Sequence, residues 1–322
     1  MNHDIDYRAE NMKKHVFKKL ITKIISALVI VFGVTFLTFL LSYLSPDDAA
    51  VVKLSSMGTG YTQEMLEETR EEMGLNRSFL EQYLDWMKNV CRLDFGRSYR
   101  TGEDITDMML AALPNTLVLA FLSLLITLVI SLPIGIMCAY HPDGVLDSLM
   151  RVFSYFFSSV PSFFISLIVL YYACIQWKLF KVMAEPGIRG FILPALVTGV
   201  TLSSWYIRQI RAIALEQLCS PYVYSLYSRG ISRSRILWKH VLKNCMVPVI
   251  TLLGISVGGL LGGSAITESI FSVKGVGALA VSAVTSRDYP FIQAYAAWMA
   301  ALYLLVNFVV DIIGRKLDPR IS

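Results

Sequence analysis

TLVLAFLSLLITLVISLPIGIMCAY, residues 116–140, is the stretch that decides the fold class of this chain. It runs for 25 residues without a charged side chain. A helix rises about 1.5 Å per residue, so the stretch is long enough to cross roughly 30 Å of bilayer hydrocarbon. Because lipid offers no hydrogen-bond partners, a single apolar segment must satisfy its own backbone as an α-helix. The stretch therefore predicts a transmembrane helix.

Other apolar stretches repeat this pattern, and they cover residues 20–44, 152–177, 191–213, 246–266 and 294–313. Of the 322 residues, 55% are hydrophobic and 16% are charged, which is too apolar for a protein whose whole surface meets water. The first stretch is too long for the core of a signal peptide, and no small-residue cleavage site follows it. The sequence predicts an all-α, polytopic membrane protein with about six transmembrane helices.

Lysine and arginine gather at three places that would lie on one side of the membrane. They outnumber acids seven to one between residues 208 and 243, and they flank the first and last stretches. Positive charge favours the cytoplasmic side, so we expect both termini in the cytoplasm. The segment 47–107, with thirteen acids and seven bases, then lies outside. The flanking residues are Lys13, Lys14, Lys18, Lys19, Lys23, Arg315, Lys316 and Arg320.

This orientation divides the chain into five parts. They are a cytoplasmic segment 1–19, the first span 20–44, an external helical segment 45–115, a transmembrane core 116–313 with a cytoplasmic loop 214–245, and a cytoplasmic tail 314–322.

The external segment contains two helical patterns. Thr62 is expected to cap the first helix, and Gly74 is expected to end it. The second helix is expected to bury one apolar stripe, formed by Leu80, Tyr83, Leu84, Met87 and Val90. Whether this small external cap covers the first span or contacts substrate stays open.

Glycine, proline and one acid mark candidate packing and gating positions. Gly254, Gly258 and Gly262 recur every four residues, which would let another helix approach closely. A kink at Pro161 could serve a gate or plain packing. Glu268 is a candidate for the translocation path or gate, because an ionisable group at the edge of the hydrocarbon must face protein or water. The segment 271–290 after it is too short to span and fits a re-entrant element.

The sequence offers no catalytic centre of its own. It contains no phosphate-binding loop, no nucleophile elbow and no His-Glu-x-x-His site. The five cysteines are scattered and the histidines fall at predicted cytoplasmic positions, so we expect neither a metal site nor a cofactor. The basic residues border membrane spans, which argues against binding of nucleic acid. The spans also lack the Asp, Glu and His chain of a proton relay, so a partner that binds ATP is favoured over an ion gradient as energy source.

Such a partner would bind to the cytoplasmic loop 214–245. Ser220 and Pro221 predict the start of a helix, and Gly230 is expected to end it with a positive φ. A second helix begins near Ser232, with Ile236, Leu237, His240 and Val241 on one face and a basic opposite face. This helix pair could dock into a groove of a soluble protein or lie on anionic lipid.

The loop also carries a resemblance. Residues 222–248, YVYSLYSRGISRSRILWKHVLKNCMVP, resemble the coupling loop of binding-protein-dependent ABC importers of the dipeptide, oligopeptide and nickel group. Two departures stand out: Tyr224-Ser225-Leu226 replaces the usual Glu-Ala-Ala, and Lys274 replaces the usual proline before Gly275. Further similar motifs are EEMGLNRSFLEQYLDWM, LDFGRSYRTGEDI, LPNTLVLA, ESIFSVKGVGALA, SRDYPFIQA and LDPRI.

The resemblance implies a permease subunit in the cell membrane, working with a second permease, two ATP-binding subunits and an extracytoplasmic substrate-binding protein. It implies peptides, nickel or nickel chelates as substrate, and TQEMLEETREEMGL, residues 62–75, resembles the nickel type more. The implied contacts to the ATPase are Tyr224, Ser225, Leu226, Gly230, Arg233 and Arg235. A gradient-driven transporter or channel is the main alternative function, and a purely structural membrane scaffold is the third possible function.

Overall fold

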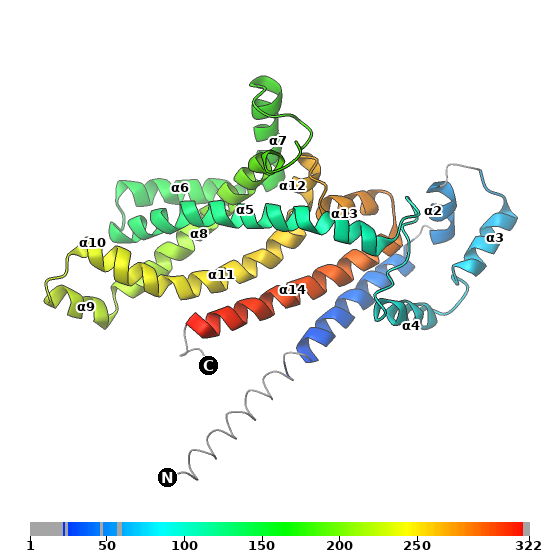
Figure 1. The fold of residues 1–322 in the computed structure, drawn as a ribbon, viewed down its shortest axis with the longest axis horizontal. Coiled ribbons are helices and arrows are strands. Elements are labelled where there is room, and N and C mark those ends of the chain that lie inside the picture. The colour runs from blue at the N-terminus through cyan, green and yellow to red at the C-terminus, as the bar shows by residue number, and fades with distance from the viewer. Residues whose placement is uncertain (1–21, 23–24, 46–47, 57–59, 318–322) are drawn as a thin grey trace, which may run out of the picture. The chain divides into compact units, whose positions relative to one another are not determined.

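The structure is a computed structural model that describes residue 22 and residues 25–45, 48–56 and 60–317 (Figure 1). Throughout this described part the chain is helical, apart from turns and one isolated bridge between Arg97 and Asp104. The predicted segment 1–19, Lys23 and Arg320 lie outside the described residues, as do the side chains of Arg315 and Lys316. The predicted all-α class is confirmed for the described residues.

The chain forms two compact units, residues 1–106 with 283–304 and residues 107–282 with 305–322. The first contains the helix Ile25–Tyr43, α2 (Ala49–Ser56), α3 (Gln63–Glu72) and α4 (Phe79–Val90). Three helices have residues in both units: α5 (Ile105–Tyr140), α13 (Val276–Thr285) and α14 (Tyr289–Leu317). The second unit contains α6 (Val145–Ser159), α7 (Ser162–Leu170), η1 (Tyr171–Gln176), α8 (Arg189–Leu218), α9 (Pro221–Ser228), α10 (Arg233–Arg235), η2 (Ile236–Val241), α11 (Leu242–Gly263) and α12 (Ala265–Ile270).

Five helices in the described chain are long and apolar enough to span a bilayer, and a bent pair brings the number to six. The bent pair replaces the single helix that the stretch 152–177 predicts: α6 and the segment 162–176 meet at 96°. Pro161 lacks an amide hydrogen and forces Val160 into an extended conformation, with φ −94° and ψ 124°, so the helix stops there. The five spans are Ile25–Tyr43, Ile105–Tyr140, Arg189–Leu218, Arg233–Gly262 and Tyr289–Val310.

The external helices begin and end as their caps predict, but α4 packs through a different face. Thr62 accepts a hydrogen bond from the Met65 amide, and Gly74 has φ +67°. The predicted stripe is wrong at Leu80 and Leu84, which are each 62% exposed, whereas Tyr83 is buried and Met87 and Val90 are half-buried. The packed face is aromatic. Aromatic rings gain free energy from edge-to-face contacts in addition to the burial of their apolar surface. The packed face joins Phe79, Tyr83 and Trp86 to Phe32, Phe36, Phe39 and Tyr43 of the first span.

This aromatic packing favours a covering role for α4. The Tyr83 hydroxyl also lies 3.1 Å from Thr35 Oγ1, a polar contact within the same interface.

A row of small residues brings α5 and α8 together in the second unit. Ser123, Thr127, Ser131 and Gly135 recur every four residues along α5, a pattern that allows close helix approach. Thr127 Oγ1 donates to the Gly199 carbonyl oxygen of α8 at 3.1 Å. A Cβ atom on Gly199 would lie 2.8 Å from the Ile126 side chain. Most members of this row are hydroxyl residues, so a repeat of glycines alone does not reveal it.

The glycines of α11 differ in their surroundings. A Cβ on Gly254 would lie 2.6 Å from Val310 Cγ2 of α14, so these two helices touch there. Gly258 is half-buried, whereas Gly262 is exposed with no other described atom within 4 Å of an added Cβ. Among the described residues, a close helix contact is therefore shown at Gly254 and not at Gly262.

We expect Gly254→Leu to lower the melting temperature of the purified protein in detergent. Overpacking a filled site costs about 1–3 kcal/mol, and the added side chain would overlap that of Val310. Gly259→Leu is the matched control, because an added Cβ there meets open space. Equal melting temperatures for the two variants would contradict the packing assigned to Gly254.

Candidate functional site

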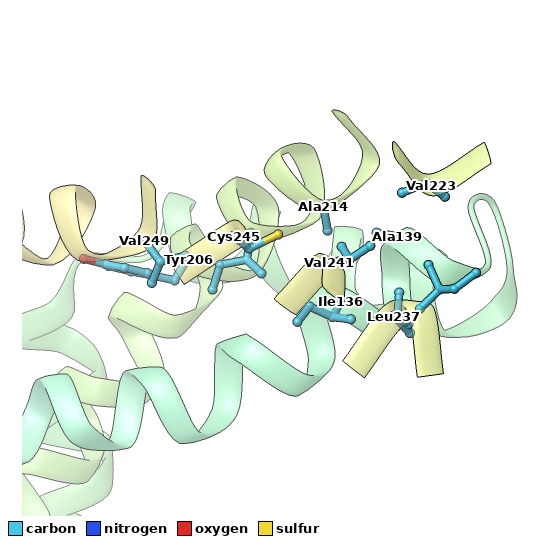
Figure 2. Close-up of a cluster of buried hydrophobic side chains, with 11 residues drawn as sticks. Ile136, Ala139, Tyr206, Ala214, Val223, Leu237, Val241, Cys245 and Val249 are labelled. Atoms are coloured by element: carbon cyan, nitrogen blue, oxygen red, sulfur yellow. The ribbon is translucent and has the colours of Figure 1, made fainter. Parts of the chain in front are cut away.

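The segment between α8 and α11, Cys219–Val241, rests on one apolar core (Figure 2). Four residues of this segment are buried: Val223, Ile236, Leu237 and Val241. The last three belong to the face predicted for the second helix, whose fourth member, His240, is half-buried. They pack with Ile136, Ala139, Tyr206, Ile210, Ala214, Cys245 and Val249 of α5, α8 and α11. We call this segment the coupling loop. Its core fixes α9 and η2 firmly to three long helices.

The start of α9 is set by Pro221 more than by Ser220. Pro221 occupies the first helical position, where its missing amide hydrogen costs nothing. Ser220 stands at the cap position, but its hydroxyl donates to the Glu216 carbonyl oxygen at 3.3 Å, so the predicted side-chain cap is wrong. Burial raises the pKa of the Tyr222 hydroxyl, which donates to Gln217 Oε1 at 3.3 Å. These contacts attach the start of α9 to the end of α8.

Gly230 ends α9 in the conformation that was predicted. Its φ is +72°, its amide donates to the Tyr227 carbonyl at 2.9 Å, and the Ile231 amide donates to the Leu226 carbonyl at 3.2 Å. These two hydrogen bonds define a Schellman motif, in which residues other than glycine are strained. An added Cβ would meet no described atom within 4 Å, so the constraint on Gly230 is backbone conformation and not space.

Most of the residues expected to contact the ATPase lie on the exposed outer face of the coupling loop. Tyr224 and Ser225 are exposed, whereas Leu226 is half-buried and packs against the core. Arg235 is exposed, and so is Arg233, whose guanidinium nevertheless contacts Tyr140. Two exposed aromatic residues of this face, Tyr227 and Trp238, were missed. Tyr227 could have been found, because it follows Tyr224 by three positions on the same helix.

Near this loop, α6 and α8 are joined by buried charges. Arg211 donates from Nε to Asp147 Oδ1 at 2.5 Å and from Nη2 to Oδ2 at 2.8 Å. Arg151 Nη2 lies 3.2 Å from Asp147 Oδ2 and 2.9 Å from Asp143 Oδ1. The Asp147 side chain is 3% exposed, so the bidentate contact compensates its burial. No sequence pattern pointed to this pair, whose members lie 64 positions apart.

Glu268 is fully buried and makes its contacts with protein groups. Its Oε1 accepts from the Ser264 hydroxyl at 3.0 Å, and its Oε2 accepts from the Ala278 amide, in the first turn of α13, at 2.9 Å. A Cβ on Gly275 would lie 2.5 Å from the Glu268 carboxyl carbon, and one on Gly277 would lie 2.9 Å from Oε2. The two glycines therefore let the chain fold over this carboxyl group.

Thr116 completes the same turn, since its Oγ1 accepts from the Val276 amide at 2.9 Å. Asn115 Nδ2 donates to the Lys274 carbonyl oxygen at 2.7 Å. This hydrogen bond holds the backbone at Lys274, the position at which the resemblance leads us to expect a proline. Glu268 thus fastens α12 to α13, while Pro161 marks the bend between α6 and α7. Among the described residues, no group of three or more His, Cys, Asp or Glu side chains is placed to hold a metal ion.

Three curated relatives are similar to this chain over almost its whole length. The metal-staphylopine import system permease protein CntB of Staphylococcus aureus is 31% identical over 307 residues, covering 95% of this chain and 98% of the relative. The nickel import system permease protein NikB of the same species is 31% identical over 305 residues, covering 95% and 92%. A probable peptide ABC transporter permease protein, y4tP of Sinorhizobium fredii, is 33% identical over 310 residues, covering 94% and 98%.

Two solved structures share the fold. An inward-facing MetNI methionine ABC transporter aligns with a TM-score of 0.55 at 15% identity, covering 65% of this chain and 96% of that chain. An amino acid ABC transporter with histidines aligns with a TM-score of 0.52 at 18% identity, covering 66% and 94%.

Two family models together match almost the whole chain. The model of the binding-protein-dependent transport system inner membrane component matches residues 131–322, and the model of its N-terminal region matches residues 16–120. The protein is thus a multi-pass membrane protein that works with other components of an ABC importer, and it is a transporter subunit, not an enzyme. This chain belongs to the family of binding-protein-dependent transport system inner membrane components, the permease subunits of ABC importers.

Proposed function

We propose that this chain pairs with a second permease to form the path for peptides or nickel chelates delivered by an extracytoplasmic binding protein. Two ATP-binding subunits drive the cycle from the cytoplasm, one of them seated on the coupling loop. Relatives named for import of metal–staphylopine, nickel and peptides support this substrate range. Closure of the ATPases would shift the two permeases between inward-open and outward-open packings.

The observation that carries this proposal is that α9 has one buried side and one exposed side. Its inner side is anchored through the buried Val223, while Tyr224, Ser225 and Tyr227 are exposed on a helix whose end is set by Gly230. A short rigid helix with an exposed aromatic face suits docking into a groove of a soluble partner. A helix pair that only lay on lipid would need no such fixed direction.

The buried acids of the spans speak against the gradient-driven alternative. Glu268 already accepts from Ser264 and Ala278, and Asp147 is bound by Arg211. A proton relay needs acids that can exchange protons along a wet path, and these two are held by fixed protein partners.

The orientation proposed for the chain is supported by the residues near the two ends of α11. Figure 1 shows that one end of α11 leads to α12 and the other to α10. At the α12 end, Asn115, Glu185 and Lys274, all from segments expected outside, line one cavity of about 300 Å³. At the opposite end, Tyr140 and Arg233, both from segments expected in the cytoplasm, are in contact. Each end thus collects residues that the charge pattern assigns to a single side.

We expect cysteines at Gln63 and Glu81 to react with a membrane-impermeant maleimide in intact cells, because both positions are exposed in the external segment. A cysteine at the exposed Ser232 should react only after the membrane is permeabilised. The native Cys91 and Cys219 are also exposed and should be replaced by serine first. The opposite labelling pattern would reverse the orientation.

For the transport function, we expect ATP-dependent uptake by the complete importer reconstituted in vesicles with its binding protein. Radiolabelled dipeptides and nickel–histidine chelates, supplied in parallel, identify which of the two substrate classes is carried. Omitting the ATP-binding subunits should abolish uptake of either substrate. Uptake that persists without them, driven by a pH or sodium gradient, would refute the ATP-driven mechanism.

A further inference from the structure

The end of α5, immediately before the turn 141–144 that leads into α6, is contacted by the coupling loop. Arg233 Nη2 donates to the Tyr140 carbonyl oxygen at 3.3 Å, and the guanidinium carbon lies 4.4 Å from the centre of the Tyr140 ring. Tyr140 is the last residue of α5, so the cation lies at the negative end of that helix. The segment that follows Gly230 is therefore attached to the end of α5, next to this turn.

The same turn is held from the other side by α8, the helix that leads into the coupling loop. The buried Asp147, in the first turn of α6, binds Arg211 of α8 through both carboxylate oxygens. Asp147 Oδ2 also accepts from the Asp143 amide at 3.0 Å. A bidentate, charge-assisted pair holds its two groups in one geometry, so a displacement of α8 is passed on to α6. A loose pair on the surface would not transmit such a displacement.

From this turn α6 leads directly to the bend at Pro161. Ser154, in the middle of α6, donates to the Ser204 carbonyl of α8 at 2.8 Å, so α6 is supported along its length. A supported helix moves as one body, and the break after Ser159 is the first place where its movement can change the backbone direction.

We propose, building on the coupling role assigned above, that Arg233, Arg211 and Asp147 are positioning residues. They carry movement of α9 through the α5–α6 turn into the bend between α6 and α7. The coupling loop then drives a change in the third span as well as in α8 and α11, which it joins directly.

The first test is substrate uptake per ATP hydrolysed, measured with the complete reconstituted importer. Arg233 is exposed, so Arg233→Gln should fold and co-purify with the ATP-binding subunits while uptake per ATP falls roughly two- to fivefold, the fold-change that corresponds to about 0.5–1 kcal/mol for an exposed cation–π contact. Arg233→Lys keeps a cation for the Tyr140 ring and should restore part of the ratio. Lys243→Gln is the matched control, an exposed basic residue on α11 whose loss should leave the ratio unchanged.

The second test measures the bend itself, with spin labels at the exposed Val152 and Leu167 on either side of it, in a chain whose Cys91 and Cys219 are replaced by serine. ATP with vanadate should change the label distance in the parent chain. Arg233→Gln and Asp147→Asn should abolish that change without altering the nucleotide-free distance. A full change in both variants, or none in the parent chain, would overturn the inference.

Gly230→Val separates this inference from the coupling role on which it rests. If Gly230→Val keeps uptake, the coupling loop itself is wrongly assigned. If Gly230→Val loses uptake while Arg233→Gln and Asp147→Asn behave as the parent chain, the coupling role stands and transmission through the α5–α6 turn is refuted.

Discussion

Gly230→Val should abolish substrate uptake while the permease still inserts and pairs with its partner permease. Gly230 has φ +72°, a conformation that costs other residues about 1–2 kcal/mol and β-branched valine more. This cost is too small to unfold a membrane domain with a core as large as the one beneath α9. It is large enough to turn α9 away from the position in which Tyr224 and Tyr227 would seat in the ATPase.

The measurement is substrate-stimulated ATP hydrolysis and uptake by the reconstituted importer, with assembly confirmed by co-purification. Gly187→Val is the matched control, since Gly187 has φ +78° and equally open surroundings, in the loop before α8. It should bring the same backbone strain without the loss of transport. Gly230→Asn should retain part of the activity because asparagine tolerates the left-handed region. Wild-type uptake by an assembled Gly230→Val complex would favour the lipid-surface role for this helix pair.

Glu268→Ala should be the most destabilising single substitution in the α12–α13 segment. It leaves the Ser264 hydroxyl and the Ala278 amide without their acceptor, and each such buried loss costs about 1–3 kcal/mol. It also empties space that Gly275 and Gly277 have left for the carboxyl group. We expect a clear drop in the melting temperature of the purified chain, followed by loss of assembled importer.

Glu268→Gln distinguishes a structural carboxyl group from one needed for its charge. The amide oxygen of glutamine can still accept from Ala278, so this variant should keep most of the stability and most of the transport. Glu67→Ala, at an exposed position of α3, serves as the control for loss of an acidic side chain. If Glu268→Gln folds normally but transports nothing, the carboxyl group acts in the path or gate and not as the fastener of α13.

Local features of the chain were predictable because they depend on neighbours in sequence. Thr62, Gly74 and Gly230 each determine a helix end through their own backbone or side chain, and all three behave as expected. Even the contact between Glu268 and Gly275 spans only seven positions, and the short interval between the acid and two glycines could have suggested it.

Features that depend on the surroundings of a helix were missed. The packed side of α4 is made by aromatic rings, and apolar character alone did not show that Leu80 and Leu84 would be exposed instead. Pro161 showed where a kink was possible, but its 96° angle depends on how α6 and α7 each pack against α8. The Asp147–Arg211 pair has no periodicity that a single sequence could display.

Asp288 has a consequence for how the protein is made. Its carboxylate accepts from the Ser98 hydroxyl at 2.5 Å and from the Tyr99 amide at 3.1 Å, closing the end of the external segment. Asp288 is synthesised 190 residues after Ser98, which takes roughly 10 to 40 s at about 5–20 residues per second. In the orientation proposed above, the external segment is already across the membrane throughout that interval with this anchor missing. Its final packing is therefore a late event of biosynthesis that waits for the last membrane span, so a chain truncated before Asp288 should expose the segment to proteases outside the cell.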